Sequence, residues 1–463
     1  MRPVKSLDPA VDAVETALRQ FLAVGAAPDD GRSRIAIALS GGRDSMVLLD
    51  AMSALAPAFA VDLSAIHVHH GLSPNADAWA EFCARECAAR SVPLSTRRVA
   101  VARRPGASLE ASARAARHAV FARLDVDAVA LAHHADDQAE TLWLQLLRGA
   151  GPHGLAAMSA DRAPAHGPRI LRPLLTLDSA SIAAVAGARG LRWVDDESNA
   201  DRSIRRNFIR HEISPLLASG FPGYPATLLR AASHQAEAAL LLDELAAQDA
   251  CAALAQDAID GATLDRSRLC ALAGKQGHRA RNLLRWFLRR HGLRAPSAAR
   301  LADLLAQLTT AGADARIRIA HDGHEISVHR GHVFVHAAVP AWPPLRWREQ
   351  ASIALPHGQL VLGEAVGEGV AVHHLAADTV VVRTRQGGER LRLGPQRPRQ
   401  LLTHVMQQQG IPHWRRDTWP LICCAGALAA VPGIGVDAQF AALPGQSGRV
   451  FGWIPRSRAP AED

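Results

Sequence analysis

A serine, two glycines and an aspartate follow the apolar residues 35–39, in an order that could hold a phosphate. The stretch reads Ser40, Gly41, Gly42, Arg43, Asp44 and Ser45. The apolar run is typical of a buried strand, the glycine pair of a tight turn, and apolar residues recur at helical spacing from residue 46. A strand, a glycine loop and a helix in this order direct free backbone N–H groups at one point, where an oxyanion can bind.

The carboxylate of Asp44 decides which kind of phosphate loop this could be. The stretch lacks the lysine of a Walker A loop and has an acid instead. A carboxylate repels a phosphate unless a divalent cation lies between them, so Asp44 indicates Mg²⁺. The alternative is an ordinary turn in which Asp44 is stabilised by the helix dipole.

A second group of polar residues, from position 133 to 141, includes His133, His134, Asp136, Asp137 and Glu140. Three interpretations compete. Asp137 and Glu140 could cap a helix, the histidines and carboxylates could bind a metal, or the carboxylates could accept a cationic amine and act as a base. Since the group follows an apolar strand, we expect it beside the glycine loop.

The third group joins an acidic loop, residues 195–201, to a basic helix. Arg206, Asn207 and Arg210 share one face of that helix. The face could be a solvated surface of weak ion pairs, or it could clamp a phosphate or an RNA backbone.

The elements that position these groups alternate between strand and helix. Strands are predicted at residues 35–39, 61–68, 94–101, 128–132 and 191–194, with helices at 79–90, 111–124 and 179–189 between them. This alternation predicts a doubly wound parallel sheet, whose ligands lie at the carboxyl ends of the strands. Ser40, His69 and His133 each follow a strand and should meet there. Residues 161–168 are predicted to be a polar loop, 228–308 helical, and 316–336 a β-hairpin.

Charge and cysteine content narrow the class of protein. The 463 residues carry a net charge of +8, almost all of the cation being arginine. A polyanionic partner would explain this charge, and so would a genomic bias towards arginine. No two cysteines are spaced as a Cys-x-x-Cys pair, so a zinc ribbon, an iron–sulfur site or a thioredoxin motif is not expected. No apolar run is long enough to span a membrane, and we expect a cytoplasmic protein.

The loop at residues 40–45 resembles the pyrophosphate loop (PP-loop) of the N-type ATP pyrophosphatases. Further motifs occur in the order seen in the tRNA(Ile)-lysidine synthase family, and resemble its long, multi-domain form. They lie at residues 67–72, 132–141, 148–151, 172–175, 195–210, 385–390, 410–417 and 430–434.

This resemblance implies an α/β PP-loop ATPase domain with a doubly wound parallel sheet, then a mainly helical domain and a small C-terminal α+β domain. The implied boundaries are 1–218, 226–338 and 360–445. ATP and Mg²⁺ would serve to adenylate the wobble cytidine of a tRNA(Ile) with a CAU anticodon. L-lysine would then displace AMP to form lysidine. The family is often dimeric, so a homodimer is compatible with it.

The resemblance also implies roles for particular residues. Ser40 to Ser45 would bind ATP, with Asp44 holding Mg²⁺. Asp44, Asp136 and Asp137 would be catalytic, and Asp137, Glu140 and Arg206 would bind lysine. The substrate pocket would comprise His67, His70, His133, Arg117 and Asn207. Contacts with tRNA would come from Arg148, Arg210, Arg390, Arg392 and Arg416.

Two other functions are compatible with parts of the sequence. A tRNA thiolase of the same superfamily needs catalytic cysteines, and no cysteine follows any of the predicted strands. A non-catalytic RNA-binding protein would not need Asp44, Asp136, Asp137 and Glu140. ATP turnover distinguishes the ligase from the binding protein.

Overall fold

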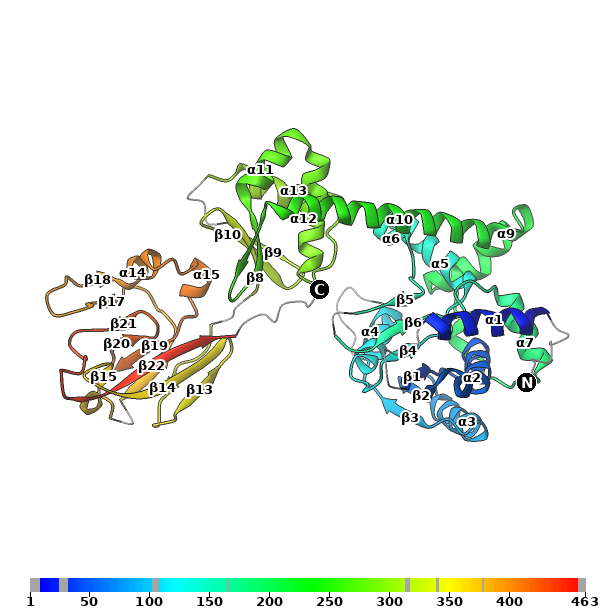
Figure 1. Ribbon diagram of the computed structural model, residues 1–463, viewed down its shortest axis with the longest axis horizontal. Coiled ribbons are helices and arrows are strands. Elements are labelled where there is room, and N and C mark those ends of the chain that lie inside the picture. Colours follow the sequence, from blue (N-terminus) through cyan, green and yellow to red (C-terminus); the bar gives the residue numbers. More distant parts are fainter. Residues whose placement is uncertain are drawn as a thin grey trace. The chain divides into compact units, whose positions relative to one another are not determined.

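The computed structural model describes residues 9–24, 32–101, 108–164, 166–312, 317–338, 341–376 and 379–456. Its contacts divide the chain into two compact units, Met1–Leu241 and Leu242–Asp463. The division falls within the 28-residue helix α10 (Tyr224–Cys251), the long green helix of Figure 1.

The first unit is built on a six-stranded sheet in the order β3-β2-β1-β4-β6-β5. The strands are β1 (Ser33–Ala38), β2 (Val61–His69), β3 (Leu94–Arg98), β4 (Ala128–Ala130), β5 (Asp161–Arg162) and β6 (Arg169–Leu171). All neighbouring strands pair in parallel except β5, which is antiparallel to β6. The prediction of a parallel sheet is therefore confirmed.

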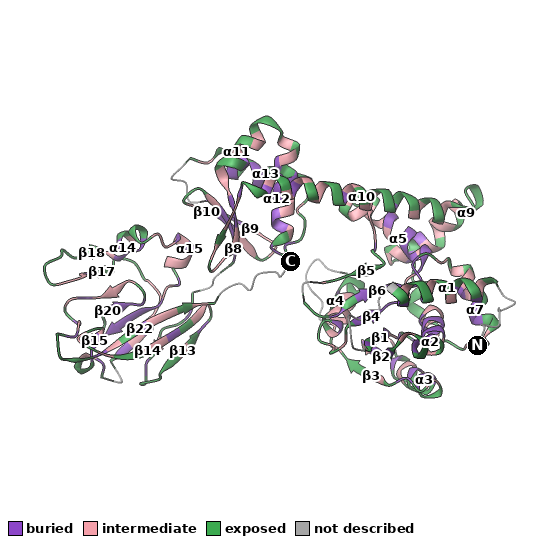
Figure 2. Ribbon diagram, in the orientation of Figure 1, coloured by how far each residue is buried: buried purple, intermediate pink, exposed green. Residues whose placement is uncertain are grey.

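Helices cover both faces of this sheet, because alternate strand residues enter different apolar clusters. Ile35 and Ile37 of β1 belong to the cluster formed with α1 (Pro9–Val24), α2 (Arg43–Leu55), α3 (Ala76–Ala89) and α7 (Ser179–Ala188). Ala36, between them, belongs to a cluster with Phe121 of α4 (Leu109–Phe121). The buried strands lie between more exposed helices (Figure 2).

The order of strands places a crevice next to β1. From β1 the chain adds β2 and β3 on one side, whereas β4 and β6 lie on the other. Ligands of doubly wound sheets bind where the strand order reverses, beyond the carboxyl ends of the strands. Here that point lies beyond β1 and β4, where the glycine loop and residues 133–141 begin.

Two segments differ from the sequence prediction. Residues 191–194 form no strand. Instead, the backbone N–H of Val194 donates a hydrogen bond to the Gly41 carbonyl of the glycine loop at 3.0 Å. Conversely, β5 lies in a stretch predicted to be a loop, and β6 follows it. These strands of two and three residues are too short for a periodic pattern to identify them.

The remaining elements of the first unit are helical and follow the sheet strands. They are η1 (Ala56–Phe59), α5 (Ala135–Leu146), α6 (Pro152–Leu155), η2 (Glu197–Ala200), α8 (Arg205–Phe208), the π-helix η3 (Ile209–Ile213) and α9 (Ser214–Gly220).

The second unit begins with helices packed on an antiparallel sheet. Helices α11 (Arg266–Lys275), α12 (Gly277–Arg290) and α13 (Ala298–Thr310) share an apolar core with that sheet, whose order is β7-β8-β11-β10-β9. The strands β9 (Arg318–His321), β10 (His324–His329) and β11 (His332–Ala337) confirm the predicted hairpin. The strands β7 (Leu254–Asp257) and β8 (Gly261–Asp265) interrupt a stretch predicted to be wholly helical.

The rest of the second unit is rich in antiparallel strands. One sheet has the order β12-β16-β19-β20-β21 and another β13-β14-β22-β15, while β17 and β18 form a separate pair. The strands are β12 (Leu345–Arg346), β13 (Ser352–Leu355), β14 (Gly358–Val366), β15 (Val370–Ala371), β16 (Val380–Arg383), β17 (Arg390–Leu391), β18 (Gln400–Leu401), β19 (Leu421–Cys424), β20 (Ala427–Val431), β21 (Gly435–Val436) and β22 (Ser447–Pro455). Between them lie η4 (Val372–His374), α14 (Leu402–Gln408) and α15 (His413–Arg416).

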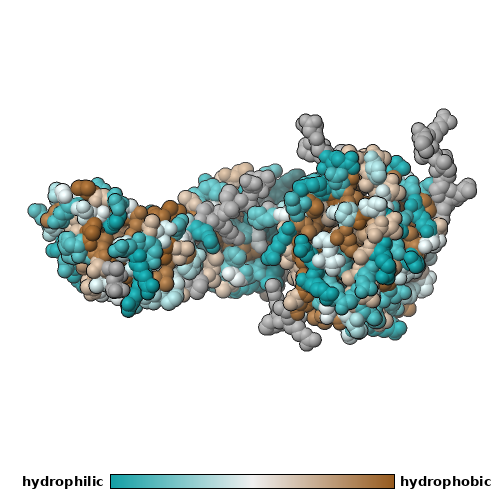
Figure 3. Space-filling model, turned by 90° about the horizontal axis from the view of Figure 1, so that it is seen from below, coloured by the Kyte–Doolittle hydropathy of each residue, from teal (hydrophilic) through white to brown (hydrophobic). Residues whose placement is uncertain are grey.

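Apolar residues are dispersed over the surface rather than gathered into a membrane-spanning element. Leu147, Leu216 and Phe221 are among the exposed large side chains, and the face drawn in Figure 3 intersperses hydrophobic with hydrophilic residues. Among the described residues, no helix combines the length and apolar character needed to cross a membrane.

Candidate active site

The glycine loop joins the carboxyl end of β1 to the N-terminus of α2. Ser45 Oγ donates to the Gly42 carbonyl at 2.8 Å, and the Ser40 and Ser45 hydroxyls lie 3.1 Å apart. Gly42 is the N-cap of α2 and provides no side chain to cap it. The first N–H groups of the helix are therefore left to an external acceptor such as a phosphate.

Gly41 is a position at which the loop requires glycine. Its φ of +88° lies in the left-handed region, which residues other than glycine rarely adopt. A Cβ at this position would lie 2.9 Å from Val194 Cγ2 and 3.2 Å from Cys83 Sγ. The loop backbone is thus held close to the segment after α7 and to α3.

Polar side chains from the loop and from α5 meet at the N-terminus of α7. Arg43 donates from Nε to Asp44 Oδ1 at 3.0 Å and from Nη2 to Ser179 Oγ at 2.8 Å. Asp136 Oδ2 accepts the backbone N–H of the same Ser179 at 2.8 Å. These contacts join the glycine loop, α5 and α7, and they fix the carboxylate of Asp136.

His134 lies among three carboxylates. Its ring nitrogens are 3.6 Å from Asp44, 3.5 Å from Asp136 and 3.5 Å from Asp137. Burial opposes the charged form of this ring, but the hydrogen bonds and charges of Asp136, Asp44 and Asp137 raise its pKa to about 10. A positively charged imidazolium therefore partly neutralises the acids at the N-terminus of α5.

Two carboxylates of α5 and two arginines form what we name the acid–arginine cluster: Asp137, Glu140, Arg206 and Arg210. Glu140 accepts from Arg206 Nε at 2.6 Å and from Arg210 Nε at 2.6 Å. Asp137 Oδ1 accepts from Arg206 Nη2 at 3.0 Å and from Arg210 Nη2 at 3.2 Å. Both carboxylates are buried, and burial without such partners would be costly.

The pKa of Asp137 is lowered despite burial, which acts in the opposite direction. The charges of His134, Arg206 and His133 lower this pKa by more than burial raises it. The sequence alone allowed a solvated surface for the basic helix, but Arg206 and Arg210 instead hold buried acids. Arg210, expected to contact tRNA, lies in this cluster.

The local backbone aligns the two arginines. Arg206 belongs to α8, and the π-helix η3 carries Arg210 directly after it. Such π-helical turns are rare and are frequently found at functional sites. Buried Asn207 donates to the carbonyls of Ser198 and Asp201, at 2.8 and 3.0 Å, and so anchors the acidic loop to this helix.

The three histidines predicted to line the substrate pocket differ in their surroundings. His67 is buried, with Nδ1 2.9 Å from the Leu39 carbonyl. His133 Nδ1 accepts from Arg172 Nε at 3.2 Å; burial lowers its pKa to about 3, and Arg172 adds to this while Asp137 opposes it. In the part of the chain that the structure describes, His70 Nδ1 is buried without a hydrogen-bond partner.

A group of arginines with few acids lies next to these histidines. Burial, together with the charges of Arg114 and Arg206, lowers the pKa of Arg117 to about 10. Burial likewise lowers the pKa of Arg172 to about 10, together with Arg162 and Arg114. Among the described residues, Arg117 Nε has no hydrogen-bond acceptor. Mutually repelling cations of this kind favour an anionic ligand.

Three residues of this region were absent from the predicted site. They are Arg114, Arg172 and His134, the last of which the sequence offers only as one of several metal ligands. No signal in the sequence reveals that Arg172 holds His133, because the two are 39 positions apart.

The other arginines predicted to contact tRNA lie in different settings. Arg148 is exposed after α5, and Arg390 is exposed on β17. Arg392 is partly buried, with its backbone N–H donating to Asp437 at 3.0 Å. Arg416 donates from Nε to the Ile411 carbonyl at 2.6 Å.

At the glycine loop, the carboxylate of Asp44 could bind a divalent cation. Among the described residues, no group of three or more His, Cys, Asp or Glu side chains has the arrangement of a metal site. Asp44 is partly exposed and next to the phosphate-binding loop. Mg²⁺ typically uses one or two carboxylates together with substrate phosphates, so the residues present fit such a site.

Taken together, the crevice offers unpaired backbone donors for a phosphate, acids for an amine, and excess arginine for further anions. The acid–arginine cluster presents both signs of charge and could hold a zwitterion. Phosphate chemistry and amine attack could therefore occur side by side.

Three protein families match successive parts of this chain. The PP-loop domain family matches residues 12–217, the TilS substrate binding domain family residues 268–334, and the TilS substrate C-terminal domain family residues 380–453. A crystal structure of the TilS C-terminal domain matches with a TM-score of 0.22 and 22% identity, over 25% of this chain and 100% of that chain.

Curated relatives match over nearly the whole length. The chain is 42% identical to the tRNA(Ile)-lysidine synthase of Azoarcus sp. (strain BH72), over 92% of this chain and 93% of that protein. It is 40% identical to the tRNA(Ile)-lysidine synthase of Nitrosomonas europaea, over 91% of this chain and 92% of that protein. The chain therefore belongs to the tRNA(Ile)-lysidine synthase family.

Proposed function

We propose that this protein ligates L-lysine to the wobble cytidine of a CAU-anticodon tRNA(Ile), using ATP, and so forms lysidine. The observation that carries this is the contact between the phosphate-binding loop and the acids of α5. His134 joins Asp44 of the loop to Asp136 and Asp137 at 3.5–3.6 Å. One crevice can therefore activate a carbonyl with ATP and present an amine to it.

In the first half-reaction the ring carbonyl oxygen of cytidine attacks the α-phosphate of ATP, and pyrophosphate leaves. The N–H groups at the start of α2 and the hydroxyls of Ser40 and Ser45 would hold the departing pyrophosphate. Mg²⁺ held by Asp44 would neutralise negative charge on the phosphates. Because Gly41 has no side chain, its backbone could approach the phosphate closely.

In the second half-reaction the ε-amine of lysine attacks the activated carbon and AMP leaves. The amine must lose a proton, which Asp136 or Asp137 would accept. We assign the binding of lysine to Asp137, Glu140 and Arg206. Because Arg206 already donates to both acids, it would also orient them when lysine is present.

Further assignments concern the RNA. Arg117, with neighbouring Arg114 and Arg172, would bind a phosphate of the adenylated intermediate or of the anticodon loop. Residues 1–218 would be the catalytic domain, and residues 226–338 and 360–445 would bind the tRNA, with Arg390 among the phosphate contacts.

The cysteines of the first unit argue against a thiolase. Cys83 and Cys87 are buried, and burial raises the pKa of their thiols to about 12 and about 11. Thiols held in this way are poor nucleophiles. A ligase therefore accounts for the site better than a sulfur transferase.

The experiment that tests the function measures pyrophosphate release from ATP and Mg²⁺ with an unmodified CAU-anticodon tRNA(Ile), with and without lysine. Release should require the tRNA and should occur in the first half-reaction without lysine. If pyrophosphate were released only with a different acceptor, the loop would still be the ATP-binding loop but tRNA(Ile) would not be the substrate. If folded protein released no pyrophosphate with any acceptor, a non-catalytic RNA-binding protein would be the better account.

A further inference from the structure

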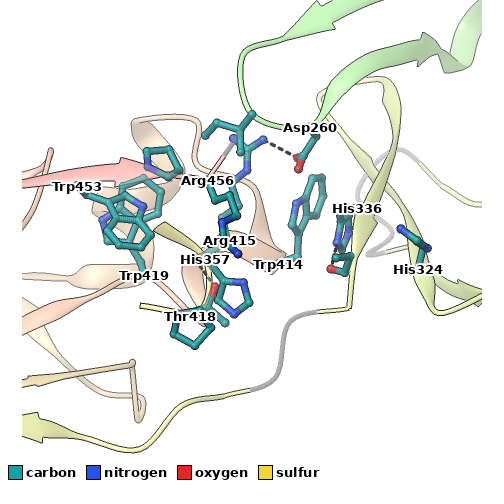
Figure 4. Close-up of a pocket in the computed structure, with 14 residues that line it drawn as sticks. Asp260, His324, His336, His357, Trp414, Arg415, Thr418, Trp419, Trp453 and Arg456 are labelled. Atoms are coloured by element: carbon teal, nitrogen blue, oxygen red, sulfur yellow. Dashed lines mark hydrogen bonds and ion pairs between the residues drawn. The ribbon is translucent and has the colours of Figure 1, made fainter. Parts of the chain in front are cut away.

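The second unit contains a cavity of about 380 Å³ that none of the assigned residues lines. Its walls come from separate elements: Trp414 from α15, Trp453 from β22, His336 from β11, and Trp419 from the residues before β19. In the view of Figure 4, Trp419 and Trp453 lie on one side, Trp414 and His336 on the other, and Arg415 and Arg456 between them.

One wall is a rigid aromatic stack. The Trp414 and His336 rings are 4.6 Å apart and inclined by 6°, and both side chains are buried. The nitrogens of His336 are occupied, Nδ1 lying 3.0 Å from the Ala337 carbonyl and Nε2 3.0 Å from Ser327 Oγ. This pair forms a fixed plane rather than a source of protons or ligands.

The opposite wall consists of two partly exposed indoles. Trp419 and Trp453 have ring centroids 6.3 Å apart, inclined by 56°. Trp419 Nε1 donates to the Pro432 carbonyl at 3.0 Å. The ring of Trp453 lies over Gly358, where a Cβ would approach it to 2.7 Å. Both indoles are held in place, yet each keeps surface available to a ligand.

The cavity has two arginines, of which one is held by two carboxylates and the other is exposed. Arg415 donates to Asp257 at 2.6 Å and to Asp260 at 2.5 Å, so its charge is compensated. Arg456 is exposed and also lines the cavity. In the described part of the chain, no carboxylate forms an ion pair with Arg456.

We propose that this cavity receives the base of one unpaired nucleotide of the RNA substrate, with Arg456 contacting its phosphate. This rests on the proposed function, in which the substrate is a tRNA. Unpaired RNA bases are recognised by stacking on aromatic side chains, which accept any base, and by arginine on the backbone. The volume lies at the small end of ligand sites, about 300–1,000 Å³, and suits a single nucleoside.

The test compares Trp419→Leu with Trp419→Phe in the full-length protein. Both variants lose the hydrogen bond to the Pro432 carbonyl, but only phenylalanine keeps a planar ring. We expect Trp419→Leu to raise the Kd for the tRNA(Ile) transcript by about 5- to 150-fold, the range for one stacked base. Trp419→Phe should remain within about threefold of the unsubstituted protein. Urea unfolding should give both variants the same stability.

A second variant tests the phosphate contact. Arg456→Ala should reduce the slope of log Kd against log salt by about 0.7, the value for one phosphate of a single strand. Arg348→Ala, an exposed arginine of the same unit that does not line the cavity, should leave the slope unchanged.

The outcomes separate this proposal from the proposed function. Equal tRNA affinities of Trp419→Leu and Trp419→Phe would refute stacking, and an unchanged salt slope for Arg456→Ala would refute the phosphate contact. In either case lysidine formation by the unsubstituted protein would leave the function intact. Absence of lysidine with a clear difference between the two variants would overturn the function and retain an RNA-binding cavity.

Discussion

Replacement of Asp137 by asparagine separates the two half-reactions. The change keeps the shape of the side chain and removes its charge. Asp137 Oδ1 accepts from Arg206 and Arg210 at 3.0 and 3.2 Å, and Oδ2 accepts from the His134 backbone N–H at 3.1 Å. Because donors face both oxygens, the new NH₂ group opposes a donor in either orientation.

The structural cost of Asp137→Asn follows from that arrangement. Leaving one buried donor without an acceptor costs about 1–3 kcal/mol of folding free energy. The protein should therefore remain folded, with a lower urea midpoint. Asp125→Asn is the matched control, because Asp125 is 95% exposed and its ion pair among the described residues is with Arg34, at 3.2 Å. It should change neither stability nor activity.

The kinetic effect should fall on the second half-reaction. If Asp137 orients the amine or removes its proton, lysidine formation in a single turnover should slow by about 10²- to 10⁴-fold. Pyrophosphate release without lysine should change less, because the described link between Asp137 and Asp44 of the loop runs through His134. Lysidine formation at the unsubstituted rate would remove Asp137 from the amine site, and equal loss of both half-reactions would contradict the division of roles.

Three further outcomes are expected. Gly41→Ala should abolish ATP-dependent pyrophosphate release, because the φ of +88° and the predicted clash distort the loop at a cost of about 1–3 kcal/mol; normal release would refute the close approach of phosphate. Reversing the charge of Arg390 and Arg397 together should weaken tRNA binding and reduce the salt slope by about 1.5, whereas an unchanged slope would assign both to a solvated surface. At pH 8, iodoacetamide should label exposed Cys251 rapidly and Cys83 only after unfolding, since burial raises the pKa of Cys83 to about 12. Equal labelling rates by mass spectrometry would contradict the packing around the loop.

The sequence predicted the first sheet well because its strands are short apolar runs separated by amphipathic helices. It failed at residues 191–194, where an apolar run lies over the glycine loop instead of joining the sheet. It also missed β7 and β8, which pair with each other, and β8 joins the sheet by pairing with β11, about 70 positions away. Pairing across such a distance leaves no local pattern.

The candidate site was predicted in part for a similar reason. The motifs identified Asp44, Asp137 and Glu140, because acids in a fixed spacing after a strand are visible in the sequence. The family resemblance grouped Arg206 with Asp137 and Glu140, but the place of Arg210 beside these acids was not predicted, because it lies about 70 positions from Glu140. The position of His134 among three carboxylates likewise depends on the meeting of separate elements.

The measurement that tests the central claim most directly is the transfer of labelled lysine into RNA. Purified protein, ATP, Mg²⁺ and [¹⁴C]lysine would be incubated with an unmodified CAU-anticodon tRNA(Ile), and the RNA would be digested to nucleosides. We predict that the label enters a single modified nucleoside derived from the wobble cytidine, and that incorporation requires ATP. The proposed reaction would be contradicted if pyrophosphate were released but no label entered the RNA. It would also be contradicted if the label were found at a different nucleotide.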